Sequence, residues 1–134
     1  MAARQLEDEA YRTLASFRHE LRRFLRFSEQ AAAEAGITAQ QHQALLALRG
    51  ADKPEMLIGE LADQLLLRPH SATELVNRLA ALDLVERRAD PADARRVGVR
   101  LTRTGNARLA ALAGAHHAEL QRLRPLLGSL LARL

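Results

Sequence analysis

Apolar residues near the start of the chain recur at steps of three and four residues, the spacing of one face of an α-helix. The repeat is carried by Leu14, Phe17, Leu21, Phe24, Leu25 and Ser28. It predicts one long helix over residues 6–35. Gly36 follows at once, and glycine is common just past a helix end because it readily adopts the left-handed conformation found there.

A second helix is expected to begin at Thr38 and to run to about residue 49. Gln41 stands three residues after Thr38, so each side chain can bond the other residue's backbone amide in a capping box. The side chains expected to be buried are Leu45, Leu46 and Leu48. Residues 50–54 are expected to form a loop, and residues 56–58 predict one short strand.

Two shorter helices are predicted next, over residues 59–66 and 68–83. The first is expected to bury Leu61, Ala62 and Leu65. The second has Pro69 in its first turn, where proline is tolerated because the amide there lacks a helical partner anyway. On a helical wheel its inward face consists of Ala72, Leu75, Val76, Leu79 and Leu82.

The outer face of the 68–83 helix carries hydrogen-bonding side chains of short or medium length. These are His70, Thr73, Glu74 and Asn77, with Ser71 and Arg78 on the flanks and Arg68 at the start. Such groups can meet base edges in a DNA groove, where asparagine suits adenine and glutamate suits cytosine. Ser71 and Arg78 are better placed for phosphates. An ordinary solvated face is the alternative interpretation of this helix alone.

A two-stranded ribbon is predicted over residues 84–105. Strand-like runs flank Asp90-Pro91-Ala92-Asp93, which is dense in turn-forming residues. Arginines crowd both sides of this turn, namely Arg87, Arg88, Arg95, Arg96, Arg100 and Arg103. Asp93 is expected to pair with Arg95 and to stiffen the turn, which leaves Arg96 free to touch DNA. The alternative is a solvated hairpin in which the aspartates are salt-bridge partners.

The positive charge of the chain is concentrated around this ribbon. Residues 85–108 hold seven arginines and three acidic side chains, and the whole chain carries a net charge of +4. Such a patch indicates a polyanionic partner. Two short helices followed by a basic ribbon form a winged helix-turn-helix, whose second helix enters the major groove. The sequence therefore predicts a mainly α fold with a small β-ribbon that binds double-stranded DNA.

With these motifs the chain resembles the MarR family of bacterial transcriptional regulators. The segments that carry the resemblance are residues 59–62, 75–79, 84–87, 90–95 and 99–105. The most specific feature is an aspartate and an arginine in the turn, followed by a Leu-Thr-x-x-Gly ending. The resemblance implies an obligate homodimer whose two winged helix-turn-helix units read a palindromic operator. The expected role is that of a repressor, with activation as the alternative.

The resemblance also divides the chain into functional parts. Residues 1–35 and 106–134 would form the dimerisation helices around a DNA-binding domain at residues 36–105. The last part is expected to be helical from 106 to 133 with an interruption near Pro125, because an internal proline removes a backbone hydrogen bond. Its leucines are too many for a short exposed tail, so they indicate burial against a second copy, against the chain's own core, or both.

Several positions depart from the family's pattern. Leu66 and Asp83 stand where the family often has glycine, and Arg68 stands where it often has serine or threonine. We expect the fold to survive these changes, whereas the base preference of relatives cannot be transferred. Arginine is common in the family at the position of Ala94, so one contact of the turn with DNA is expected to be missing or moved to Arg96.

Many members of the family release DNA when a small, often phenolic or anionic, compound binds between the dimer helices and the winged domain. The candidates to line such a site in this chain are Arg18, His19, Arg22 and His42. Each has a simpler alternative, since arginine and histidine on long helices are usually solvated or ion-paired. The adjacent His116 and His117 do not predict a metal site, because neighbours on a helix project about 100° apart.

Composition excludes several other classes. The chain has no cysteine, which rules out disulfides and thiolate metal sites. No apolar run reaches the ~18–20 residues of a membrane span, so a cytoplasmic protein is expected. No phosphate loop, metal-ligand spacing or nucleophile–base set is present, so neither an enzyme nor a cofactor is expected. A winged-helix protein-interaction module without DNA binding is the alternative function, and the basic ribbon argues against it.

Overall fold

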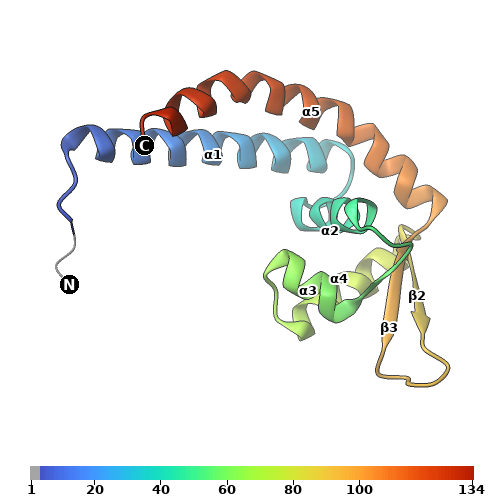
Figure 1. Ribbon diagram of the computed structural model, residues 1–134. Coiled ribbons are helices and arrows are strands. Elements are labelled where there is room, and N and C mark those ends of the chain that lie inside the picture. The colour runs from blue at the N-terminus through green and yellow to red at the C-terminus, as the bar shows by residue number, and fades with distance from the viewer. Residues whose placement is uncertain (1–3) are drawn as a thin grey trace.

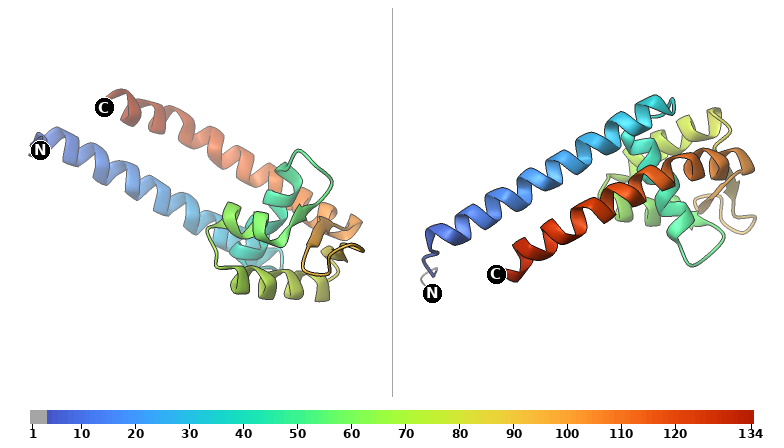
Figure 2. Two further views of the ribbon diagram at one scale, coloured as in Figure 1. Left: turned by 60° about the horizontal axis from the view of Figure 1, so that its bottom comes forward. Right: turned by 90° about the horizontal axis from the view of Figure 1, so that it is seen from above.

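Two long helices, α1 (Asp8–Glu34) and α5 (Arg103–Ala132), run side by side and form an arm that projects from a lobe of shorter elements (Figure 1, Figure 2). The computed structural model describes residues 4–134. The lobe contains α2 (Ala39–Gly50), α3 (Ile58–Leu65), α4 (Pro69–Ala81) and a small antiparallel sheet. The predicted architecture, mainly α with a small β-ribbon and long terminal helices, is confirmed.

The sheet has three strands in the order β1-β3-β2. Strands β2 (Val85–Ala89) and β3 (Val97–Leu101) pair along their whole length and form the predicted ribbon. Strand β1 (Met56–Leu57) adds to the other edge of β3, with Met56 opposite Val99. The short strand thus ends one residue earlier than predicted, because Ile58 already starts α3.

Local signals fix the junction between α1 and α2 as predicted. Gly36 has φ of 80°, and the amide of Ile37 reaches back to the carbonyl of Ala32 at 3.0 Å, which closes the end of α1. The amide of Gln41 donates to Thr38 Oγ1 and the amide of Thr38 donates to Gln41 Oε1, each at 3.0 Å. This is the predicted capping box, and it starts α2.

The core of the lobe lies between α2, α3, α4 and the sheet. Its fully buried side chains include Leu45, Leu61, Val76, Leu79, Leu84 and Val99. Two predicted core positions are wrong. Leu46 is 53% exposed, because it projects about 100° away from its neighbour Leu45 on α2. Leu82 is 50% exposed, because α4 ends at Ala81 and Leu82 no longer follows the helical wheel.

Both positions that lack the family's glycine keep the backbone conformation that favours glycine. Leu66 has φ of 56° and Asp83 has φ of 60°. A left-handed residue with a Cβ costs roughly 1–2 kcal/mol, and aspartate tolerates it better than leucine. The rest of the lobe holds the turn after α3 and the turn after α4 in this conformation. The prediction that the fold tolerates Leu66 and Asp83 is therefore confirmed.

Helix α5 differs from the prediction at its start and at Pro125. It begins at Arg103, and Thr102 caps it by accepting a hydrogen bond from the amide of Gly105 at 2.9 Å. It then runs through Pro125 without a break, so the predicted interruption is wrong. Proline removes only the hydrogen bond to the carbonyl of Gln121, and that residue is exposed and can bond water instead. Buried Leu123 and Leu130 hold the helix against α1 on either side.

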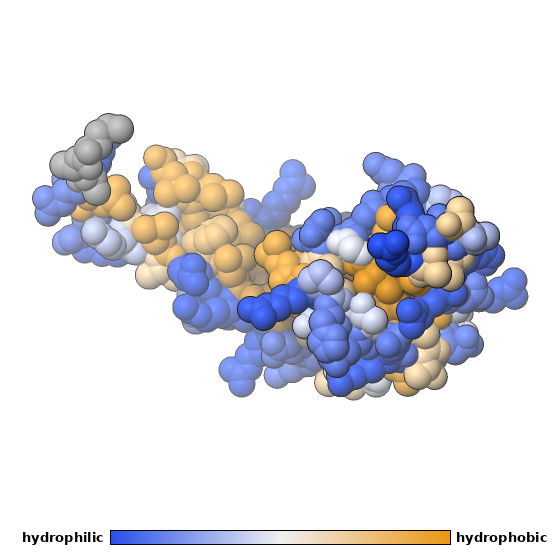
Figure 3. Space-filling view, turned by 90° about the horizontal axis from the view of Figure 1, so that it is seen from below, coloured by the Kyte–Doolittle hydropathy of each residue, from blue (hydrophilic) through white to orange (hydrophobic). Residues whose placement is uncertain are grey.

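The apolar repeat of α1 is only partly buried within the chain. Leu14 is 46%, Leu21 is 40% and Leu25 is 50% exposed, and these three residues are called the leucine stripe below. The buried positions of the helix are Thr13, Glu20, Ser28 and Ala32. Figure 3 shows apolar side chains gathered along the arm. Within residues 4–134 no helix is long and apolar enough to cross a membrane.

Candidate nucleic-acid interface

Helix α4 divides into a buried and an exposed face, as its pattern predicted. Ala72, Leu75, Val76 and Leu79 are buried. The other side exposes Arg68, His70, Ser71, Glu74, Asn77 and Arg78, with Thr73 half-buried between the faces. Pro69 stands at the first position of the helix, directly after Arg68. The helix therefore presents every predicted DNA-contacting side chain except Thr73 fully to solvent.

Three of the four predicted base-reading side chains make contacts within their own helix. His70 Nε2 lies 3.3 Å from Glu74 Oε1, one turn further along. The hydroxyl of Thr73 donates to the carbonyl of Pro69 at 3.0 Å. Both contacts lie at the surface and are exchanged at little cost, so they leave the outer face of α4 available to another molecule.

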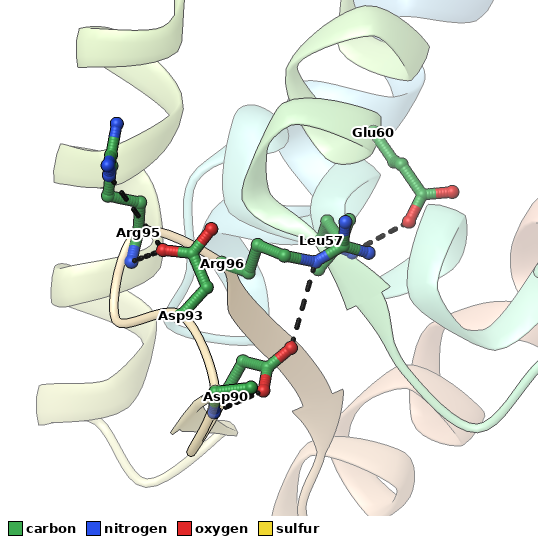
Figure 4. Close-up of polar contacts among 7 residues, drawn as sticks. Leu57, Glu60, Asp90, Asp93, Arg95 and Arg96 are labelled. Carbon is green, nitrogen blue, oxygen red and sulfur yellow. Dashed lines mark hydrogen bonds and ion pairs between the residues drawn. The ribbon is translucent and has the colours of Figure 1, made fainter.

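The turn between β2 and β3 is built by two aspartates, shown in Figure 4. Asp90 Oδ1 accepts from the amide of Ala92 at 2.8 Å, and Asp93 Oδ1 accepts from the amide of Arg95 at 3.0 Å. Such bonds from a side chain to the amide two residues on are the usual reason for aspartate in turns. The predicted contact of Asp93 with the Arg95 side chain is also present, at 3.8 Å. We call β2, this turn and β3 the wing.

The two arginines at the tip differ in their surroundings. Arg95 is 96% exposed in its side chain, whereas Arg96 is 59% exposed and lies 3.8 Å from Asp90. The prediction that Arg96 would be free is therefore wrong, because Asp90 lies beside it across the closing turn. A pair at this distance on the surface contributes little, roughly 0–1 kcal/mol, so a phosphate can compete for Arg96.

Strand alternation separates the other two wing arginines. Arg87 lies on the same face of β2 as buried Val85, toward α4, and its Nη1 donates to Asn77 Oδ1. Arg88 lies on the opposite face together with Glu86. Glu86 pairs with Arg100 on the neighbouring strand at 2.9 Å. Of these two arginines, only Arg87 contacts α4, and Arg88 lies on the face of the wing that points away from that helix.

A cleft of about 660 Å³ lies between the starts of α3 and α4 and the wing. It gathers four of the predicted DNA-binding residues, namely Thr73, Arg87, Arg95 and Arg96. Glu60 on α3 also lines it, which the sequence did not suggest. Hydrogen bonds from the Lys53 ammonium and then from the Leu57 amide lower the pKa of Glu60, so it stays ionised beside the arginines. Figure 4 shows the side chain of Arg96 extending from the turn toward Leu57 and Glu60.

The four residues predicted to line an effector site lie in different surroundings. Arg18 and Arg22 are exposed on α1. His19 lines a cleft of about 430 Å³ between α1 and α5, together with Glu20 and Arg133. His42 is only 3% exposed and lies in the core of the junction between arm and lobe. The effector site stays a prediction.

His42 packs against a partner that the sequence did not reveal. Its ring centroid lies 4.5 Å from that of His116 on α5. His116 Nδ1 donates to the carbonyl of Leu112, and its Nε2 accepts from the hydroxyl of Ser28, each at 2.9 Å. In the neutral form of the His116 ring, the bond to the Leu112 carbonyl places the proton on Nδ1, since a carbonyl can only accept. His42 Nδ1 is buried without a partner.

This histidine pair predicts lower stability in mild acid. Burial and then the neighbouring His116 lower the pKa of His42 below its ordinary value. The unfolded chain therefore binds the proton more tightly, and stability present above pH ~6.5 is lost as the pH falls through that value, by at most about 1.4 kcal/mol per pH unit. Urea unfolding at pH 7.5 and pH 5.5 measures the loss.

The matched variants are His42→Phe and His117→Phe, the second at an exposed position of α5. His42→Phe is expected to reduce the loss of stability between the two pH values, whereas His117→Phe leaves it unchanged. An equal loss in the wild type and in His42→Phe would contradict the assignment.

The sequence comparison and the structure comparison both find proteins of the MarR family. A sequence model of the MarR family matches residues 35–96. The structure is similar to AbsC, a MarR family transcriptional regulator from Streptomyces coelicolor, with 21% identity, a TM-score of 0.77, and 90% of this chain and 81% of that chain covered. It is also similar to wild-type MarR from E. coli in its apo form, with 25% identity, a TM-score of 0.71, and 87% and 92% covered.

A third similar structure contains nucleic acid. It is the F27L mutant of MepR from S. aureus bound to an oligodeoxyribonucleotide, with 22% identity, a TM-score of 0.68, and 81% of this chain and 79% of that chain covered. No curated protein sequence matches the chain.

Proposed function

We propose that this protein, whose residues 35–96 match the MarR family model, is a dimeric transcriptional regulator that binds a specific double-stranded DNA sequence. The observation that carries the proposal is the shared surface of α4 and the wing. The exposed outer face of α4 and the arginines of the wing tip lie on either side of one cleft. A helix in the major groove and a basic ribbon along the backbone would use both at once.

Helix α4 and the wing would contact different parts of the DNA. Base edges would be read by His70, Thr73, Glu74 and Asn77, and phosphates would be held by Arg68, Ser71, Arg78, Arg87, Arg88, Arg95 and Arg96. Arg95 is the strongest candidate, since its side chain is 96% exposed and its backbone is fixed by Asp93. The family's typical role is repression of a nearby gene, and we assign that role to this chain.

Dimerisation completes the proposal. The leucine stripe of α1 and exposed Leu120, Leu126 and Leu131 of α5 give the arm an apolar surface that a second copy would cover. Two identical units related by a twofold axis would meet two half-sites about one helical turn apart, near ~10 base pairs. The parts would be residues 1–35 and 106–134 for dimerisation and 36–105 for DNA binding.

The salt dependence of binding tests the proposal. The full chain is used to select duplexes from a random library. Their affinity is then measured by fluorescence anisotropy at salt concentrations from about 50 to 300 mM. We expect log Kd to rise steeply with log salt, because each neutralised phosphate releases counterions. Arg95→Ala is expected to weaken binding to every duplex roughly tenfold and to lower the slope by about one.

The matched control is Arg26→Ala, which removes the same charge from an exposed position of α1. It is expected to leave both affinity and slope unchanged. Failure to select any duplex, or a salt response that is flat, would refute DNA binding and favour a winged-helix module that binds protein.

A further inference from the structure

One contact joins the wing to the outer face of α4. Arg87 Nη1, from β2, donates to Asn77 Oδ1 on α4. The contact follows from the fold, because strand alternation turns Arg87 to the same side as buried Val85, toward the helix. Within residues 4–134 Arg87 has no carboxylate partner, and its guanidinium donates to the neutral amide oxygen of Asn77 instead. Both side chains stay exposed on the proposed DNA-binding surface.

The contact fixes which end of the Asn77 amide faces outward. A guanidinium carries five N–H donors and no acceptor, so it can only bond the oxygen of the amide. The amide oxygen of Asn77 is therefore held by Arg87, and its NH₂ group is left to meet another molecule. One lone pair of the Asn77 oxygen remains, but it lies beside the guanidinium, and the other polar groups that the pair presents are all N–H donors.

This arrangement changes the base that Asn77 suits. Pairing of asparagine with adenine requires both ends of the amide, because the oxygen accepts from N6 while the nitrogen donates to N7. An amide whose oxygen is already bonded to a guanidinium has one acceptor site left, and its orientation is set by Arg87 and not by the base. Guanine presents two acceptors, N7 and O6, at the same edge of the major groove. A surface on which N–H donors outnumber acceptors matches guanine better than adenine.

We propose that Arg87 is a specificity-determining residue that makes Asn77 read guanine instead of adenine. The inference rests on the proposed function and refines it at one base pair of the half-site. In place of the phosphate contact assigned to it above, Arg87 acts through Asn77, and its own remaining N–H groups reinforce the same preference. The expectation from the sequence, that Asn77 pairs with adenine, then holds only when Arg87 is removed.

Binding of single-substitution duplexes tests the pair. The starting duplex is the best one selected by the full chain from a random library. Each base pair is replaced in turn, and the position at which Asn77→Ala loses its preference identifies the base that Asn77 contacts. At that position the wild type is expected to prefer guanine over adenine about tenfold, the usual scale for one bidentate contact. Arg87→Ala is expected to reverse the preference toward adenine.

Two further variants distinguish a change in base preference from a general loss of affinity and from misfolding. Arg88→Ala removes the same charge from the opposite face of β2, so it is expected to keep the preference for guanine. Arg87→Lys keeps a donor at the site and is expected to retain part of that preference, and it replaces Arg87→Ala if the latter does not fold by circular dichroism. A preference for adenine in the wild type, or Arg87 variants that weaken all duplexes equally, would overturn the inference while leaving DNA binding intact. A chain that selects no duplex would instead refute the proposed function and the inference together.

Discussion

Gly105→Ala is expected to lower the free energy of unfolding by roughly 3 kcal/mol, the upper range for overpacking a core position. A Cβ at this position would lie 2.0 Å from the carbonyl oxygen of Leu84 and 3.0 Å from its carbonyl carbon. Neither backbone can retreat easily, because that same carbonyl accepts from the amide of Thr102 at 3.1 Å and Leu84 is 1% exposed. The gain of up to ~1 kcal/mol from alanine in a helix is too small to offset the clash.

Gly114→Ala is the matched control in the same helix. A Cβ there meets nothing within 4 Å, so only the helix propensity changes. We expect a gain in stability of up to about 1 kcal/mol. Urea unfolding followed by circular dichroism measures both variants. If Gly105→Ala were as stable as Gly114→Ala, the backbone of α5 at Gly105 could not lie as close to the Leu84 carbonyl as described.

The Leu-Thr-x-x-Gly ending therefore has a structural explanation. Thr102 Oγ1 donates to the carbonyl of Asp83 at 2.6 Å and accepts from the amide of Gly105 at 2.9 Å. It thereby ties the end of α4 to the start of α5, while Gly105 lets the two backbones approach. The most specific motif of the resemblance thus sets the direction in which the arm leaves the lobe, and the bases are left to other residues.

The parts of the fold that follow from short-range chemistry could be predicted from the sequence. Thr38 and Gln41 form a capping box wherever they start a helix, and Gly36 permits the turn before them. The errors arose where tertiary packing decides. Leu46 has the composition of a core residue but the wrong angle on α2, and Pro125 breaks a hydrogen bond but not a helix that α1 supports.

The candidate site shows the same division. The helical period was enough to find which face of α4 is exposed. The contact between Arg87 and Asn77 was not predictable, because it depends on which face of β2 carries Arg87 and on the distance from that strand to α4. The contact of Arg96 with Asp90 depends likewise on how the turn closes. The contact between buried His42 and half-buried His116 joins helices that are far apart in the sequence.

Replacing Leu21 and Leu25 by glutamate is expected to give a monomer and to weaken DNA binding at least about a hundredfold. Both leucines belong to the leucine stripe, at 40% and 50% exposure, so the changes cost little within the single chain. In the proposed dimer each would place a charge in a desolvated apolar interface, which is strongly unfavourable. A monomer engages one half-site, and the loss of the second removes an avidity gain of about 10²–10⁴.

Light scattering coupled to size exclusion measures the mass, and anisotropy with the selected duplex measures the affinity. Gln30→Glu adds one negative charge, as each of the two leucine changes does, at an exposed position of α1 outside the leucine stripe, and it is expected to leave both quantities unchanged. Intact secondary structure in the double variant would show that the lobe still folds, so its weak binding would come from the missing partner. A double variant that remains a dimer and keeps its affinity would place the interface elsewhere, and the two winged units would then have to be held together by another surface.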